Sequence, residues 1–224
     1  MNPDDDRTNS TGVDSAPPAP APGSRPADDS PHMLAISLAV VSAAAMIGGS
    51  ELLLWLRYER EAILSGQVWR MLTAHITHLG WEHLALNVAG LALLWLMFAR
   101  LLTIGRWSIV VIGSGLGVST GLLAFNPELQ WYVGMSGLLH GMFVAGAVAG
   151  IHAGYRFEWA LLGLVAVKLA WERVTGPATS TEQIVGGSVV VDSHLYGAIA
   201  GLLVILAIIA FDRARAGTAP TGPA

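Results

Sequence analysis

The feature that most constrains this chain is a series of six long apolar stretches separated by short polar segments. They cover about residues 33–49, 83–99, 107–125, 136–151, 159–171 and 194–211, and residues 52–56 extend the first. Apolar runs of this kind are typical of helices that cross a membrane, although the fourth and fifth are shorter than the ~20 residues usual for a span. The sequence therefore predicts an all-α polytopic membrane protein with six transmembrane helices.

Composition supports a membrane protein and excludes several kinds of chemistry. Only 12% of the residues are charged and 53% are hydrophobic, whereas a soluble domain usually has about 25% charged residues. The chain has no cysteine, which excludes disulfides, thiolate-bound zinc and a cysteine nucleophile. We expect the lipid bilayer as a partner and no nucleic acid, because the chain has no basic stripe.

The apolar stretches divide the chain into a membrane domain and two tails. Residues 1–31 are rich in Pro, Ala, Asp, Ser and Gly, which predicts a disordered N-terminal tail. Residues 32–212 form the predicted membrane domain and 213–224 a short C-terminal tail. Within the domain, the mixed segment 50–82 is expected to lie at the membrane interface between the first two spans.

Six spans place both termini on the same side of the membrane. Arginines in the short loops and ends on that side indicate that it is the cytoplasm. We expect the membrane to be a bacterial inner membrane. These are Arg100, Arg106, Arg156, Arg213 and Arg215.

Four polar residues stand where lipid would make them costly, at the outer ends of spans two, four and six: His83, Asn87, Ser136 and His194. On the predicted topology these three spans all run from outside to inside. The four side chains are therefore expected at a similar depth, within reach of water, which indicates a shared functional site.

Ser136 is the candidate nucleophile of that site. It lies between glycines in the segment Gly134-Met135-Ser136-Gly137, where its amide at the start of a helix is free to donate to an oxyanion. A serine needs a base to remove its proton, and His194 is the candidate base. The alternative is that Ser136 is only a small residue that permits close helix packing.

His83 and Asn87 are four residues apart and so share one helix face. Both can donate hydrogen bonds, which suits an oxyanion hole, and one missing donor of this kind costs about 10²–10³-fold in turnover. A structural hydrogen bond between helices is the alternative interpretation.

His194, Gly197 and Gly201 project from one side of the sixth span. This glycine face is expected to pack against the fourth span and to bring the imidazole near Ser136. Asp192 is too close in sequence to His194 to orient it, so we expect a Ser–His dyad.

The carboxylate of Glu172 is expected to pair with Lys168, four residues earlier in the fifth span. This leaves no carboxylate assigned to His194.

His140 follows Ser136 by one helical turn and is open to two interpretations. It could stack on His194 or hydrogen-bond it, or it could be the base itself.

A metal site is a further hypothesis, because His75 and His78 lie close to His83 in sequence. Their spacing matches neither H-E-x-x-H nor H-x-x-E-H, so we expect no metal and no other cofactor.

These motifs, in this order, resemble the rhomboid family over about residues 50–211. The resemblance is carried by Trp69-Arg70, His83-x-x-x-Asn87, Gly134-Met135-Ser136-Gly137, and Ser193-His194-Leu195-Tyr196-Gly197 with Gly201. It implies a six-helix bundle and cleavage of peptide bonds in or beside a membrane segment by a Ser–His dyad without a cofactor. It also implies that the Ser136 amide, His83 and Asn87 hold the oxyanion.

Three segments are further similar to the rhombosortase subfamily: residues 136–141, 168–172 and 191–197. That similarity implies membrane-anchored substrates with a C-terminal Gly-Gly-type tail. His140 departs from many rhomboids, which carry Tyr there.

Two other function classes compete with a protease. One is a catalytically inactive rhomboid-like factor that binds or handles membrane proteins, and the other is a small transporter. Inactive relatives generally lack the serine or the histidine, and no inverted repeat suggests a transporter. The sequence leaves open the oligomeric state and whether the acyl-enzyme passes to water or to an amine.

Overall fold

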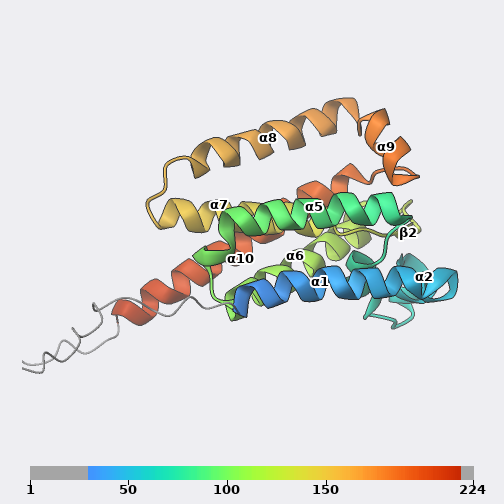
Figure 1. Ribbon diagram of the computed structural model, residues 1–224, viewed down its shortest axis with the longest axis horizontal. Coiled ribbons are helices and arrows are strands. Elements are labelled where there is room, and N and C mark those ends of the chain that lie inside the picture. Colours follow the sequence, from blue (N-terminus) through green and yellow to red (C-terminus); the bar gives the residue numbers. More distant parts are fainter. Residues whose placement is uncertain (1–29, 218–224) are drawn as a thin grey trace, which may run out of the picture.

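The computed structural model describes residues 30–217, and these residues form a bundle of helices (Figure 1). Six long helices coincide with the six predicted spans: α1 (Ser30–Ile47), α5 (Trp81–Phe98), α6 (Ile104–Phe125), α7 (Ser136–His152), α8 (Glu158–Thr175) and α10 (Val191–Gly217). Most of the N-terminal tail and the last residues of the C-terminal tail lie outside the described residues. The C-terminal tail boundary predicted at residue 213 falls inside α10.

Three of the described helices are long and apolar enough to cross a membrane: Trp81–Leu101, Ile104–Phe125 and Val191–Gly217. The apolar helices Pro31–Ile47 and Ser136–His152 are shorter. Helix α8 is interrupted by charge at Glu158, Lys168, Glu172 and Arg173. The number of membrane spans therefore remains a prediction.

Helix α7 is the central helix of the bundle, and α10 packs against it more extensively than any other pair of elements. Glycine allows this approach. A Cβ added to Gly197 would lie 1.9 Å from the carbonyl oxygen of Gly137, and one added to Gly201 would lie 2.1 Å from that of Gly141. The two backbones thus touch along their glycine faces, as predicted for the fourth and sixth spans.

The interfacial segment between α1 and α5 is built from short elements. They are α2 (Gly49–Leu56), β1 (Tyr58–Glu59), α3 (Arg60–Leu64), α4 (Arg70–Thr73) and η1 (Ala74–Ile76). The buried Arg70 guanidinium donates to the backbone oxygens of Leu54 and Arg57 at 2.8 and 2.9 Å. This arginine satisfies carbonyls that the end of α2 leaves unpaired.

A two-stranded sheet connects that segment to the loop before α7. Strand β1 pairs antiparallel with β2 (Trp131–Tyr132), with Tyr58 opposite Tyr132. Both tyrosines are buried. Because β2 ends four residues before Ser136, this pairing fixes the loop that leads into α7 (Figure 1).

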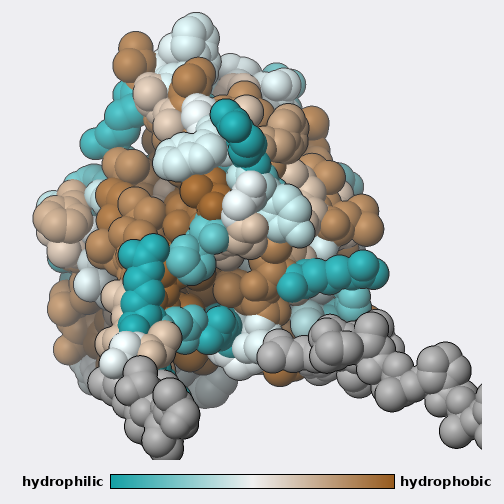
Figure 2. Space-filling view, turned by 90° about the vertical axis from the view of Figure 1, so that its left-hand side faces the viewer, coloured by the Kyte–Doolittle hydropathy of each residue, from teal (hydrophilic) through white to brown (hydrophobic). Residues whose placement is uncertain are grey.

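The remaining short elements lie in connections, η2 (Ala99–Leu101) after α5 and α9 (Thr179–Val185) after α8. Helix α8 lies on one side of the bundle next to α7 (Figure 1), and Val165 is its only buried residue among those described. Hydrophilic side chains gather between apolar ones on the end of the molecule formed by the start of α8 and the end of α10 (Figure 2). That end carries the exposed Arg156 and Arg213.

Candidate active site

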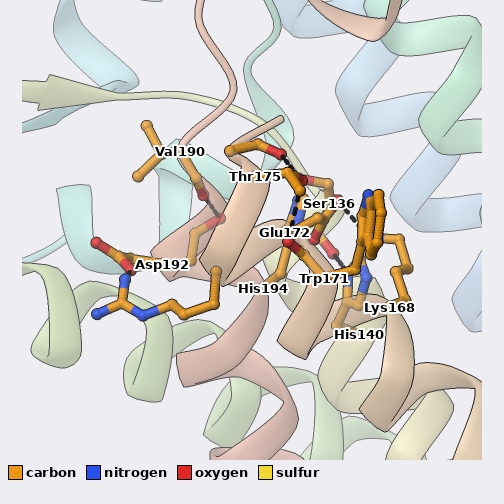
Figure 3. A network of polar contacts seen from close by, with 12 residues as sticks. Ser136, His140, Lys168, Trp171, Glu172, Thr175, Val190, Asp192 and His194 are labelled. Carbon is orange, nitrogen blue, oxygen red and sulfur yellow. Dashed lines mark hydrogen bonds and ion pairs between the residues drawn. The ribbon is translucent and has the colours of Figure 1, made fainter. Parts of the chain in front are cut away.

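Ser136 and His194 meet near the N-terminal ends of α7 and α10, as the sequence predicted. The Oγ of Ser136 lies 3.0 Å from Nε2 of His194 (Figure 3). His194 is 5% exposed, whereas Ser136 is partly accessible. The distance is a hydrogen bond of the length expected between a nucleophile and its base.

The other ring nitrogen of His194 faces a carboxylate that the sequence analysis did not assign to it. Nδ1 lies 2.9 Å from Oε2 of Glu172 on α8. Because a carboxylate only accepts, Nδ1 carries the proton and Nε2 is free to accept the proton of Ser136. The expectation that no carboxylate reaches His194 is therefore wrong, and the pair is part of a Ser–His–Glu arrangement.

The spacing of residues in α8 shows which helix face carries Glu172 once the buried residue of this helix is known. Val165, Lys168 and Glu172 are spaced three and four residues apart, so they share a helix face. Val165 is the buried residue of this helix, so the same face carries the carboxylate toward α7 and α10. The predicted ion pair is also present, with Lys168 Nζ 2.6 Å from Glu172 Oε1.

Asp192 points away from His194, as predicted. Its carboxylate accepts a hydrogen bond from Asn126 at 2.7 Å and forms an ion pair with Arg173. Tyr196 in turn donates to the side-chain oxygen of Asn126 at 2.9 Å. This network joins the C-terminal end of α8 and the N-terminal end of α10 to the loop after α6.

His140 stacks on His194, with ring centroids 4.3 Å apart and an angle of 17° between the rings. Its Nδ1 lies 2.8 Å from the backbone oxygen of Ser136. A carbonyl only accepts, so His140 donates to it and its Nδ1 is not available to the hydroxyl. Of the two interpretations of His140, the geometry favours the stacking partner over the base.

Gly134, two residues before the nucleophile, has a conformation that favours glycine, with φ of +121°. A Cβ there would lie 3.0 Å from Nε2 of His83, so this imidazole edge faces the loop that leads to Ser136. The Leu79 amide donates to Nδ1 of His83 at 3.4 Å. Nε2 therefore carries the proton and is a donor toward that loop.

Asn87 lies one turn further along α5 and is buried. Its side-chain nitrogen donates to the backbone oxygen of His83 at 3.0 Å, which uses one of its two protons. His83, Asn87, Ser136 and His194 all line one cleft of about 1100 Å³. The four polar residues predicted to share a depth therefore share a cleft.

The backbone of Ser136 adds a further donor at this cleft. Ser136 is the first residue of α7, and the first amides of a helix have no partner within it. The site thus has a candidate nucleophile, a candidate base, a carboxylate and three candidate oxyanion donors.

The other histidines of the metal hypothesis, His75 and His78, are both buried, and the ring of His78 lies edge-on to that of His83 with centroids 5.0 Å apart. His75 lies between the backbone oxygens of Gly115 and Gly134, at 2.9 and 3.4 Å, and burial lowers its pKa. Burial, and to a lesser degree the charge of His83, lowers the pKa of His78 to about 3. Both are therefore neutral at neutral pH.

Within the described residues, one group could hold a metal ion: His140, Glu172 and His194, whose ligand atoms lie within 4.8 Å of one another. The nitrogens of His194 already contact Ser136 and Glu172. A metal ion bound there would replace those hydrogen bonds and compete with serine chemistry.

Comparison with known protein families shows which family the chain belongs to. Residues 65–211 match the Rhomboid domain, which covers well over half of the chain. The chain belongs to the rhomboid family. Rhomboid membership, together with the three long apolar helices, makes it an integral membrane protein.

A named relative supports the same family at lower coverage. The chain is 31% identical over 81 residues to "Putative rhomboid protease YdcA" of Bacillus subtilis (strain 168). The match covers 36% of this chain and 41% of that relative, so the chain spans less than half the length of the protein it resembles.

Proposed function

We propose that this rhomboid-family chain is an intramembrane serine endopeptidase that cleaves membrane-anchored proteins. The observation that carries the proposal is the hydrogen bond of 3.0 Å between Ser136 and His194 in a cleft among apolar helices. A binding factor without catalysis would gain nothing from a serine held against the unprotonated nitrogen of a buried imidazole.

The proposed reaction follows the order of contacts in the cleft. Ser136 Oγ attacks the carbonyl carbon of the scissile peptide bond, and His194 Nε2 takes the hydroxyl proton. The oxyanion accepts hydrogen bonds from the Ser136 amide, His83 Nε2 and the Asn87 amide. His194 then gives its proton to the leaving amine as the carbon–nitrogen bond breaks, which leaves an acyl-enzyme on Ser136.

The proposed topology has all six long helices crossing the membrane and both termini in the cytoplasm. The helices shorter than a usual span are packed inside the bundle or against it. The charged side chains near the end of α8 are paired, Lys168 with Glu172 and Arg173 with Asp192. The end of the molecule with the exposed Arg156 and Arg213 is the cytoplasmic one on this proposal. A bacterial inner membrane is the proposed location.

The proposed substrates carry a C-terminal tail of the rhombosortase type, with glycines, one membrane helix and basic residues. The three segments that carry the resemblance to rhombosortases come together at the cleft, since Ser136, Glu172 and His194 belong to one each. Segments that together determine substrate specificity are expected to lie at one site, as these three do.

A reporter with such a tail tests this proposal in reconstituted bilayers. The purified chain is expected to cleave the reporter, and Ser136→Ala is expected to leave it intact. A matched reporter with Leu-Leu in place of Gly-Gly is expected to react at least about tenfold more slowly. Equal cleavage by wild type and Ser136→Ala would exclude the protease mechanism, and equal rates for both reporters would exclude only the tail specificity.

A further inference from the structure

The carboxylate of Glu172 has a position that a surface ion pair does not explain. Its two oxygens are divided between two partners, Oε1 to Lys168 at 2.6 Å and Oε2 to His194 at 2.9 Å. The Glu172 side chain is 17% exposed, whereas the Lys168 side chain is 44% exposed. The carboxylate is therefore turned inward, with the lysine on its outer side.

We propose that Glu172 is a positioning residue that orients His194 for proton transfer, and that Lys168 holds the Glu172 carboxylate in place. This inference rests on the proposed protease function and adds a third member to its Ser–His pair. The three residues then come from three helices: α7 supplies the nucleophile, α10 the base and α8 the acid (Figure 3).

The chemistry of the histidine explains what the carboxylate contributes. Hydrogen bonding of Nδ1–H to Glu172 selects the tautomer whose Nε2 can accept a proton from Ser136. When the bond from Oγ to the carbonyl carbon forms, that proton moves to Nε2 and the imidazole becomes a cation. Glu172 keeps its negative charge, stabilises that cation at 2.9 Å, and does not itself take the proton.

The burial of His194 makes this contact more valuable than it would be in water. His194 is 5% exposed, and α8 presents apolar side chains to the outside, among them Trp171 and Val174. A cation formed on a buried imidazole without a nearby anion is strongly disfavoured. The other acid of this region, Asp192, is engaged by Asn126 and Arg173 and does not contact the imidazole.

Lys168 has a separate role in this arrangement. It precedes Glu172 by one turn, and its ammonium binds the oxygen that does not contact His194. The contact restricts the carboxylate to the rotamer that reaches Nδ1, so loss of Lys168 weakens the orientation of Glu172 without removing its charge.

The test compares three variants of the full chain, each purified and reconstituted with a cleavable membrane substrate. Glu172→Gln keeps the shape of the side chain and removes its charge. It is expected to lower kcat by about 10³–10⁴-fold with little change in KM, as for loss of the acid in other serine triads. Lys168→Met is expected to lower kcat by less than about tenfold, because Glu172 still contacts His194.

Arg173→Met is the matched control, since it breaks the neighbouring ion pair to Asp192 but leaves the contact of Glu172 with His194. It is expected to keep kcat within about threefold of wild type. Nitrogen NMR of labelled histidine provides a readout that a merely structural role would not change. The Nδ1–H tautomer of His194 is expected in wild type and Lys168→Met, and to be lost in Glu172→Gln.

Two results would overturn the inference. One is a kcat for Glu172→Gln within tenfold of wild type, and the other is an equal loss in Lys168→Met and Glu172→Gln, which would show that the ion pair only holds α8 in place. In both cases wild type cleaves and Ser136→Ala does not, so the protease function stands. Cleavage that survives Ser136→Ala would instead refute the proposed function itself.

Discussion

Replacing His194 by alanine is expected to reduce kcat by about 10⁶-fold, the size of loss seen when the base of a serine protease is removed. Of the two stacked imidazoles, His194 contacts the Ser136 hydroxyl at 3.0 Å, whereas His140 donates from Nδ1 to the Ser136 carbonyl. His140→Ala removes a stacked ring and a hydrogen bond to the Ser136 carbonyl but leaves the contact of His194 with Ser136, and it is expected to keep kcat within about 10²-fold of wild type.

Cleavage rates of a membrane substrate, measured for both variants under saturating substrate, separate the two histidines. His152→Ala, at the last residue of α7, is the control and is expected to match wild type. A larger loss in His140→Ala than in His194→Ala would reverse the assignment of the base.

Replacing Gly201 by alanine is expected to damage both stability and activity, although the residue lies two turns from His194. The new Cβ would lie 2.1 Å from the Gly141 carbonyl oxygen and 2.6 Å from its Cα. Those atoms are backbone and cannot rotate away, so α7 and α10 must separate. Overpacking of this kind costs about 1–3 kcal/mol or more. A shift of about 1 Å between Ser136 and His194 costs about 10²-fold in rate.

Gly163→Ala is the matched control for this glycine effect. Gly163 lies in the middle of α8, where an added Cβ would meet nothing within 4 Å. Alanine there is expected to stabilise the helix slightly, by up to about 1 kcal/mol, and to leave kcat unchanged. Thermal unfolding in detergent and cleavage rates check both variants. If Gly201→Ala melts at the temperature of Gly163→Ala and cleaves as fast, the close packing of α7 on α10 is wrong.

Much of the site could be predicted from the sequence because its residues are costly in lipid. Ser136 and His194 needed an explanation in apolar helices, and their motifs placed them at similar depths. The glycine face of α10 followed from spacing, and it is confirmed by the contact of Gly197 with Gly137. Local periodicity is enough for predictions of this kind.

The contact of the Glu172 carboxylate with His194 was not predicted, because Lys168 alone is a sufficient partner for that carboxylate. Lys168 and Glu172 at four-residue spacing satisfy each other's charge, so nothing in the pattern required a third group. That Oε2 also reaches His194 depends on how α8 lies against α7 and α10, which sequence spacing does not determine. The pairing of Tyr58 with Tyr132 is likewise a contact between distant segments, and no local signal predicted it.

The central claim is that His194 activates Ser136 as a nucleophile, and covalent labelling measures this most directly. The full chain in detergent is treated with a fluorophosphonate, which bonds to an activated serine, and the labelled peptide is identified by mass spectrometry. The account predicts an adduct on Ser136 in wild type and none on Ser136 in His194→Ala. Absence of an adduct on Ser136 in folded wild type, or equal labelling of Ser136 in both proteins, would contradict it.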